Sequence, residues 1–422
     1  MIDNELEFYQ ILREELIPAL GCTEPISIAY AAAKAREILG EAPDHIHIYA
    51  SGGLIKNIRC VTVPNTGGLI GIKASAIAGV VGGNSSKELQ VLEDISPEDR
   101  IQMRLLLAQN ITTVDLLETK LNLHFILKLG TNHQYVEVEV KNLHTNITKI
   151  VHNGTIIHEE EGSLRFYQGK MTNRDFMTIE GIVNFASNTD WQRLKKALHR
   201  QVEYNMAIAY EGLTNPYGVS IGNSILKHYP TVYGKMKGHA AAASEARMCG
   251  SDLPVITNSG SGNQGIAASI PIVVYAQEMN LSEEQLYRGL AISNLLTIYQ
   301  KNYIGRLSAF CGAISACAGA GAAVTYLAGG TLEQVKMTVT NALADASGIV
   351  CDGAKASCAS KIATGIEAAC VSHFLAMENK SYQPFAGFLG EDADKTIQAV
   401  GRIASEGMKD TDRVILNIML EK

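Results

Sequence analysis

Four of the eight cysteines in this chain lie where a thiol could take part in chemistry. Cys22 stands in a break before an expected helix, where free N–H groups and the helix dipole favour a thiolate. Cys311 precedes Gly312 in a segment of small residues, and Cys351 and Cys358 bracket a polar loop. Converging sulfurs of this kind can hold an iron–sulfur cluster. The spacing alone leaves a plain structural role open, because the sequence has no C-x-x-C pair of the zinc-ribbon or ferredoxin type.

The remaining thiols are expected to be ordinary core residues: Cys60, Cys249, Cys317 and Cys370. The first residues of the chain form an acidic, amphipathic segment that resembles neither a signal peptide nor a transit peptide. Many cysteines without such a leader indicate a reducing compartment. We therefore expect free thiols and a cytoplasmic protein.

A glycine-rich loop at 257–265 is the second candidate for chemistry. It contains the G-x-G-x-x-G spacing of dinucleotide-binding loops, at Gly260, Gly262 and Gly265. Against that interpretation, Pro271 interrupts the helix that such a loop should open, and no βαβ alternation surrounds it. The loop is better interpreted as a set of donors for a small carboxylate, with a plain turn between helices as the alternative. The candidate substrate-binding residues of this loop are Ser261, Gly262 and Asn263.

Basic residues gather near the cysteines. Lys301 and Arg306 precede Cys311, while Lys355 and Lys361 lie in and after the polar loop. The carboxylate of an amino acid needs such a cation, ideally the guanidinium fork of arginine. Lys301 and Arg306 are therefore candidate substrate-binding residues, and ordinary helix surface charge is the alternative.

The spacing of apolar residues predicts the elements that position these groups. Helices are expected at 5–17, 25–39, 69–82 and 98–109. Thr23 is suited to cap the second of these helices, and Pro25 to lie in its first turn. Strands are expected at 46–51, 56–63, 123–130, 135–141, 148–154 and 155–161, with a hairpin turn at 152–155.

From about residue 175 the strand pattern gives way to helices rich in Ala and Gly. We therefore predict an α+β fold in three parts. N-terminal helices at 1–42 carry the GlyCysThrGluPro motif, and an α+β lobe with a mainly antiparallel sheet follows at 43–175. Residues 176–422 form an all-α catalytic domain of small-residue helices. The active site is expected between the lobes.

Composition excludes some classes of partner. The formal net charge is −7, and no basic face or polybasic arm is present, so neither nucleic acid nor a membrane surface is expected to bind. The uncharged run between Arg306 and Glu333 consists largely of small residues, which transfer poorly into lipid. We expect that run to form a buried helix.

Five motifs together resemble those of a known family. They are GlyCysThrGluPro at 21–25, ProAsnThrGlyGly at 64–68, SerGlySerGlyAsnGlnGly at 259–265, IleGlyArgLeuSerAlaPheCysGlyAla at 304–313 and CysAspGlyAlaLysAlaSerCys at 351–358. In these motifs the chain resembles, over essentially its full length, the L-cysteine desulfidase family, which is related to the iron–sulfur L-serine dehydratases. The resemblance implies an oxygen-sensitive 4Fe–4S cluster held by Cys311, Cys351 and Cys358. It also implies that Cys22, Thr23 and Glu24 lie at the substrate, with Cys22 as the candidate base and Glu24 as the next candidate.

The implied reaction is β-elimination from L-cysteine to pyruvate, ammonia and hydrogen sulfide, with an open cluster iron as the Lewis acid. Dehydration of L-serine on the same scaffold is one alternative. A non-catalytic protein whose cluster or zinc ion reports on sulfur or redox state is another. The sequence ends Asn-Ile-Met-Leu-Glu-Lys, without the terminal Cys that can cap the cluster in serine dehydratases, so the fourth iron is expected to be open or bound by Cys22. The expected partner is a small amino acid, and a homodimer is left open.

Overall fold

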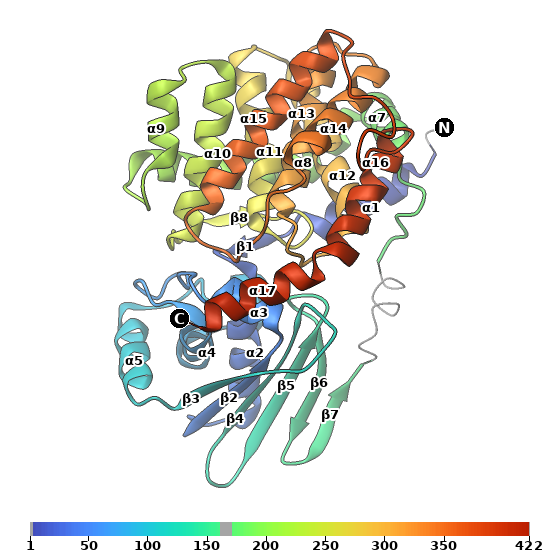
Figure 1. Cartoon of the computed structure of the whole chain (residues 1–422). Helices are drawn as coiled ribbons and strands as arrows, with labels where there is room; N and C mark the ends of the chain where they lie inside the picture. Colours follow the sequence, from blue (N-terminus) through green and yellow to red (C-terminus); the bar gives the residue numbers. More distant parts are fainter. Residues whose placement is uncertain (1–2, 161–170, 422) are drawn as a thin grey trace.

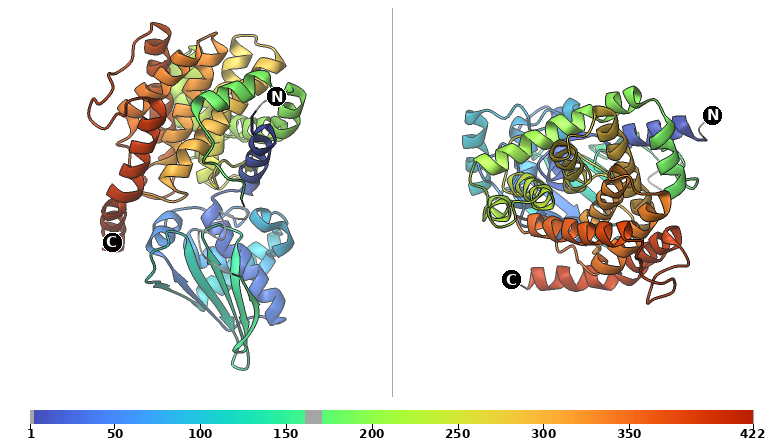
Figure 2. Two further views of the ribbon diagram at one scale, coloured as in Figure 1. Left: turned by 90° about the vertical axis from the view of Figure 1, so that its right-hand side faces the viewer. Right: turned by 90° about the horizontal axis from the view of Figure 1, so that it is seen from above.

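Two hydrophobic cores divide the chain into two lobes in the computed structural model, which describes residues 3–160 and 171–421. One core lies inside a bundle of helices, and the other lies between a sheet and the helices that cover it. The bundle and the sheet lobe are stacked along the long axis of the molecule (Figures 1 and 2). The predicted α+β fold with a helical C-terminal region is confirmed.

The sheet lobe contains six strands in the order β3-β2-β4-β5-β6-β7. Their bounds are β2 (His45–Ala50), β3 (Thr112–Leu116), β4 (His124–Gly130), β5 (Tyr135–Lys141), β6 (Ile147–His152) and β7 (Thr155–Glu159). All neighbours pair antiparallel except β2 and β3, which run parallel. In β5 every second residue is buried, as the Val-Glu alternation predicts. Glu161, at the end of the last expected strand, lies outside the described residues.

The turn between β6 and β7 has the predicted hairpin geometry. Asn153 and Gly154 both have positive φ, 49° and 81°. Two such residues in succession are typical of the type I′ turn, which matches the twist of the strands on either side.

The expected strand at 56–63 is wrong. Helix α3 (Gly52–Ile58) occupies the first part of this segment, and an isolated bridge joins Thr62 to Ile70 after it. The β-branched residues favoured a strand, but Leu54 and Ile58, four residues apart, are both fully buried on one side of the helix. Strand β3 was not expected, since only its first residue is buried.

Helices α2 (Thr23–Leu39), α4 (Gly71–Gly82) and α5 (Pro97–Ala108) complete the sheet lobe. Contact between α2 and α4 is at the level of the backbone: a Cβ on Gly79 would lie 2.1 Å from the carbonyl oxygen of Ala29. The close approach fixes α2, whose N-terminus carries the GlyCysThrGluPro motif.

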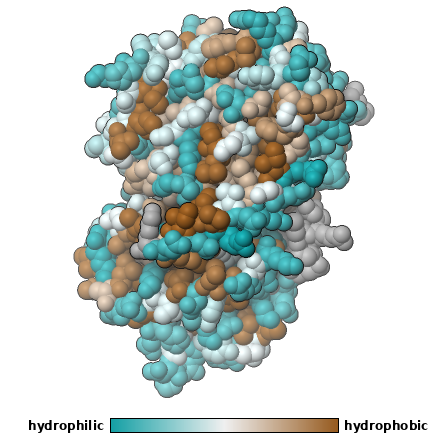
Figure 3. Space-filling model, viewed as in Figure 1, coloured by the Kyte–Doolittle hydropathy of each residue, from teal (hydrophilic) through white to brown (hydrophobic). Residues whose placement is uncertain are grey.

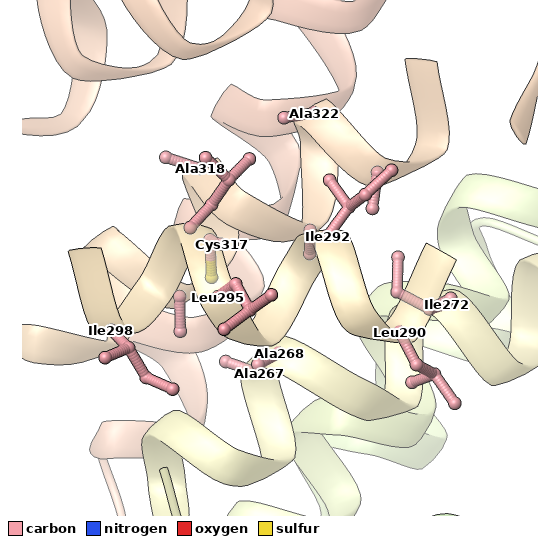
Figure 4. Packing of buried hydrophobic residues seen from close by; sticks show 14 of the residues in the cluster. Ala267, Ala268, Ile272, Leu290, Ile292, Leu295, Ile298, Cys317, Ala318 and Ala322 are labelled. Carbon is pink, nitrogen blue, oxygen red and sulfur yellow. The ribbon is translucent and has the colours of Figure 1, made fainter. Parts of the chain in front are cut away.

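The bundle contains helices from both ends of the chain. They are α1 (Glu5–Glu15), α7 (Ile179–Asn188), α8 (Trp191–Thr214), α9 (Ile221–His228), α10 (Val232–Met248), α11 (Gly262–Glu278), α12 (Glu283–Ile304), α13 (Gly312–Leu327), α14 (Leu332–Ala346), α15 (Cys358–Met377) and α16 (Ala393–Arg402). Small side chains from α11 and α13 pack against larger ones from α12 in its core (Figure 4). The predicted uncharged helix is α13, which is buried here. Among the described residues, no helix combines the length and hydropathy needed to cross a bilayer.

The chain passes between the lobes at β1 (Pro18–Leu20), which pairs antiparallel with β8 (Pro254–Ile256). The segment before residue 43 therefore contributes to both cores, α1 to the bundle and α2 to the sheet lobe. Gly21–Pro25 and the glycine-rich loop follow β1 and β8 directly, so the pairing brings both motifs to the junction. No parallel sheet occurs in 250–350, and the glycine-rich loop opens a helix that contains Pro271, so the dinucleotide interpretation has no structural support.

The C-terminal helix α17 (Lys409–Leu420) follows a π-helical turn and crosses the junction on the outside. It contacts α3, and Asp412 forms an ion pair with the buried Lys56 of that helix. Its outer face exposes Val414, Ile418 and Leu420, visible as an apolar patch in Figure 3. This helix ties the end of the bundle to the sheet lobe beside the cysteine loop.

Candidate active site

Cys22, Thr23 and Glu24 meet the glycine-rich loop at the junction. The N-cap residue of α2 is Cys22, whereas the sequence predicted Thr23 in that role. Thr23 is instead the first helical residue. The Thr23 hydroxyl lies 3.0 Å from the carbonyl oxygen of Gly260 and 3.1 Å from Oε2 of Glu24. These bonds join the start of α2 to the loop that follows β8.

Glu24 is a buried carboxylate at the centre of the site, with 8% of its surface exposed. Oε2 accepts hydrogen bonds from Cys22 Sγ at 2.9 Å and from Thr23, and Oε1 accepts one from Asn57 Nδ2 at 3.1 Å. Burial alone would raise the pKa of Glu24, but the charge of His144, the hydrogen bond from Cys22 and the charge of Arg247 lower it overall. Glu24 is therefore an ionised carboxylate near neutral pH.

His144 lies on the sheet-lobe side of this carboxylate. Burial lowers the pKa of His144 to about 4, although the charge of Glu24 opposes this. The ring is consequently neutral near pH 7, where hydrogen bonds and Arg247 keep Glu24 ionised. Nε2 of His144 is buried and has no hydrogen-bond partner.

The expected thiolate at Cys22 is wrong. Burial, followed by the negative charge of Glu24, raises the pKa of Cys22 well above its ordinary value, and the opposing charge of Arg247 is a smaller effect. The helix N-terminus is present as predicted, but the carboxylate two residues later folds back onto the thiol. The structure therefore assigns the charge to Glu24 and the proton to Cys22.

Cys311, Cys351 and Cys358 come from adjoining segments of the bundle. Cys311 is the N-cap residue of α13, and Cys358 is the first residue of α15. The strand-like segments at Phe310 and Val350 form a bridge, supported by hydrogen bonds from Cys311 N to the Ile349 carbonyl at 3.1 Å and from Cys351 N to the Ala309 carbonyl at 2.6 Å.

These three thiols affect one another electrostatically. Burial, then negative charge on Cys351 and Cys358, raises the pKa of Cys311 to about 12. Three ionised thiols therefore need positive charge among them. Cys358 also packs against the small cluster formed by Cys22, Val61 and Met248.

Three cysteines are the kind of donor that a thiolate-ligated cluster needs. Within the described ranges, no group of three or more His, Cys, Asp or Glu side chains is placed to hold a single metal ion. In a cubane, by contrast, each thiolate bonds a different iron. Glycines line the cysteine segments closely: a Cβ on Gly312 would lie 2.5 Å from Gln264 Nε2, and one on Gly353 would lie 2.5 Å from the carbonyl oxygen of Lys56. The residues present are thus compatible with an iron–sulfur cluster.

The predicted cations are brought to this junction, with partners of their own. Arg306 Nη2 lies 2.7 Å from Oε1 of the buried Glu15, which also binds Arg174 at 2.6 Å. Lys301 donates to the carbonyl oxygen of Arg306 at 3.4 Å. Burial lowers the pKa of Lys301 to about 8, and negative charge on Cys351 and Cys311 opposes that shift. Lys301 is therefore placed to offset the charge of the thiols.

The remaining basic residues of the cysteine segments pair locally. Lys355 and Lys361 both form ion pairs with Asp352. Lys56 donates to the carbonyl oxygen of Cys351 at 3.0 Å. Asn57, the next residue, donates to Glu24, so the end of α3 touches the cysteine loop and the carboxylate together.

The glycine-rich loop is held by buried amides. Asn258 Nδ2 lies 3.0 Å from Asn294 Oδ1, and Asn294 exchanges hydrogen bonds with Gln201 at 2.8 and 3.0 Å. Ser261 is the N-cap residue of α11 without a side-chain cap bond. Asn263 accepts from Ser244 at 3.1 Å, so part of its amide is used within the protein.

Sequence reasoning missed several residues of the site: Glu15, Lys56, Asn57, His144 and Arg247. None lies in a recognisable motif. The available signal was a charged residue inside an apolar or Ala-rich stretch, as at Arg247 in α10, because a buried charge needs a partner.

Comparisons with known proteins are consistent with this arrangement. The family described as serine dehydratase alpha chain matches residues 86–417, a range that includes Cys311, Cys351 and Cys358. The UPF0597 protein of Treponema denticola is 47% identical over 421 residues, covering 98% of both chains. The UPF0597 protein of Lachnoclostridium phytofermentans is 45% identical over 97% of this chain and 98% of its own. That of Finegoldia magna is 44% identical over 98% of this chain and 99% of its own.

The state of Cys22 can be measured directly. In metal-free protein we expect Cys22 to remain protonated at pH 9, because burial and Glu24 both disfavour the thiolate. The measurement is the ultraviolet absorbance of thiolate during a pH titration, compared between wild type and Cys22→Ser. Cys60, replaced in the same way, is the control; it is exposed, so its predicted place in the core is wrong. A difference attributable to Cys22 near pH 7 would contradict the raised pKa.

Proposed function

The chain belongs to the serine dehydratase alpha chain family, and on this premise we propose that it is a 4Fe–4S-dependent lyase that degrades L-cysteine to pyruvate, ammonia and hydrogen sulfide. The observation that carries the proposal is that Lys56 and Asn57, consecutive residues of α3, bind the carbonyl oxygen of Cys351 and the buried carboxylate of Glu24. The cysteines can hold the cluster, and the carboxylate can accept a proton.

Cys311, Cys351 and Cys358 would hold the cluster. When bound by these three thiolates, the cluster would supply a Lewis acid for the departing β-substituent. Lys301 and Lys361 lie close enough to feel the charges of Cys311 and Cys351, and would offset the negative charge of the thiolates. The backbone pairing of 309–311 with 349–351 would keep two of the ligands at a fixed separation.

Glu24 would take the Cα proton of the substrate. Its carboxylate is ionised, and the hydrogen bonds from Cys22, Thr23 and Asn57 fix its orientation. As the proton moves to Glu24, the electron pair of the Cα–H bond forms the Cα–Cβ double bond and the Cβ–S bond breaks. The aminoacrylate then tautomerises and hydrolyses to pyruvate and ammonia, while the sulfur leaves as hydrogen sulfide.

Cys22 would serve chiefly as a donor to Glu24 in this scheme. Cys22 and Cys358 belong to one small apolar contact cluster, and Cys22 would be the candidate ligand of a fourth iron in the resting protein. A thiol substrate suits the site because soft sulfur ligands favour iron–sulfur centres. L-serine is the second candidate substrate, and the family match is the observation that favours it.

The ligand assignment predicts three sensitive positions. Cys311→Ser, Cys351→Ser and Cys358→Ser should each lose bound iron and sulfide and the broad visible absorption of anaerobically reconstituted protein, because a thiolate ligand is removed. Cys60→Ser and Cys370→Ser are matched controls and should keep the cluster. Full iron and sulfide content in any of the first three variants would remove that residue from the ligand set. A colourless wild-type protein that binds zinc would instead favour the sensor alternative.

The assignment of Glu24 as the base predicts that turnover can be lost while the cluster is kept. Glu24→Gln should keep the side-chain size and the cluster but lower turnover by roughly 10²–10⁴-fold, the usual contribution of a general base. The measurement is the anaerobic rate of pyruvate formation, together with iron content. Glu378→Gln, at an exposed carboxylate, is the control. A wild-type rate in Glu24→Gln would rule out the carboxylate as the base.

A further inference from the structure

Arg247 is a buried cation whose Nε has no hydrogen-bond partner. It lies in the last turn of α10, and only 2% of its surface is exposed. Its charge acts on Glu24, but its Nε donor is left unused. A guanidinium removed from water in this way is costly unless an anion compensates it.

The guanidinium lies against the N-terminus of α11. A Cβ on Gly262, the first residue of that helix, would lie 2.3 Å from Arg247 Nε and 2.6 Å from Cζ. Only glycine leaves room for the side chain there. The first N–H groups of a helix have no partner within it, and Ser261 provides no side-chain cap. Two independent sources of positive potential therefore meet at one point.

The other cations of the junction are already engaged. Arg306 and Arg174 share Glu15, and Lys301 donates to a backbone carbonyl. Glu24 feels the charge of Arg247, but its oxygens accept hydrogen bonds from other residues. Arg247 is therefore the cation that is available to an incoming anion.

An acceptor for an ammonium group lies in the same turn. Gln264, in the first turn of α11, has a buried Oε1 without a hydrogen-bond partner. Arg247 and Gln264 thus supply an unused donor and an unused acceptor at the start of this helix.

We infer that Arg247 and the N-terminus of α11 form the subsite for the α-carboxylate of an amino-acid substrate. The inference deepens the proposed function and rests on it for the identity of the substrate. It assigns carboxylate recognition to Arg247 in place of Arg306, whose charge is used by Glu15. Gly262 is assigned a steric role, because its missing side chain admits the guanidinium.

The test uses the anaerobically reconstituted full chain and two probes, propionate and ethylamine, which carry only the carboxylate or only the amine. Ligand-observed saturation-transfer NMR gives the Kd of each probe, and pyruvate formation gives KM and kcat for L-cysteine. The variants are Arg247→Met and Arg247→Lys, with Arg402→Met, at an exposed ion pair, as the matched control. Thermal melting checks that each variant is folded.

We expect Arg247→Met to raise the propionate Kd and the KM for L-cysteine by roughly 10- to 100-fold, the range for a charge-assisted hydrogen bond. Ethylamine binding should change little, because that probe has no carboxylate. The propionate Kd and the KM are the readouts of the subsite, since Arg247 also helps to keep Glu24 ionised and its loss affects kcat for that reason. Arg247→Lys should raise the same two constants, since it keeps the charge and loses the fork.

The outcomes separate the two proposals. If wild type forms no pyruvate but binds propionate in an Arg247-dependent way, the proposed function fails and the anion subsite stands. If wild type does not bind propionate, the subsite is overturned. It is also overturned if folded Arg247→Lys keeps the wild-type propionate Kd and KM. Should Arg247→Met fail to fold, Arg247→Lys decides the question alone.

Discussion

The buried carboxylate of Glu24 is the constraint on which the rest of the site depends. An ionised carboxylate away from water is tolerated only when hydrogen bonds and positive charge surround it. Glu24 obtains them from the start of α2, from Asn57 at the end of α3 and from Arg247 in α10. These residues belong to both lobes, so the stabilisation of one charge ties the relative position of the two cores to the chemistry between them.

The residues around Glu24 also need hydrogen-bond partners of their own. Lys56 directly precedes Asn57 in α3, and it binds the carbonyl oxygen of Cys351 and the side chain of Asp412. The C-terminal helix, the cysteine loop and Glu24 are therefore linked through two consecutive residues of α3. On the bundle side, hydrogen bonds among the side-chain amides of Gln201, Asn294 and Asn258 hold the glycine-rich loop. That loop accepts a hydrogen bond from the Thr23 hydroxyl. Leaving any of these buried polar groups unpaired is costly, which makes the junction cooperative.

Much of the fold could be predicted because local signals agreed with the final packing. The Val-Glu alternation of β5 and the Asn153–Gly154 turn specify a face and a geometry without help from distant residues. The prediction of a strand at 56–63 failed because it relied on the β-branched residues of that segment. In the structure Leu54 and Ile58 are buried on one side of a helix. Burial depends on partners from elsewhere in the chain, which periodicity alone does not supply.

The residues proposed for the site from the sequence remain a prediction, and the electrostatics expected for Cys22 differ in the structure. The helix N-terminus at Cys22 was recognised, but the effect of Glu24 on the thiol depends on how the carboxylate folds back within the buried site. Arg306 was proposed as a carboxylate ligand because it lies near Cys311 in sequence, whereas its partner Glu15 is 291 residues away in the chain. Arg247 has no motif around it, and only the three-dimensional structure reveals that it is buried with its Nε unpaired.

The central claim is that this junction performs β-elimination on L-cysteine. The most direct measurement is the anaerobic formation of pyruvate and sulfide by the reconstituted chain, with L-cysteine and L-serine assayed side by side under the same conditions. The account predicts equal amounts of pyruvate and sulfide from L-cysteine, with a kcat/KM higher than that for L-serine. Pyruvate from L-serine alone would contradict the assignment of substrate, and no pyruvate from either amino acid, in protein with full iron and sulfide content, would contradict the assignment of a lyase.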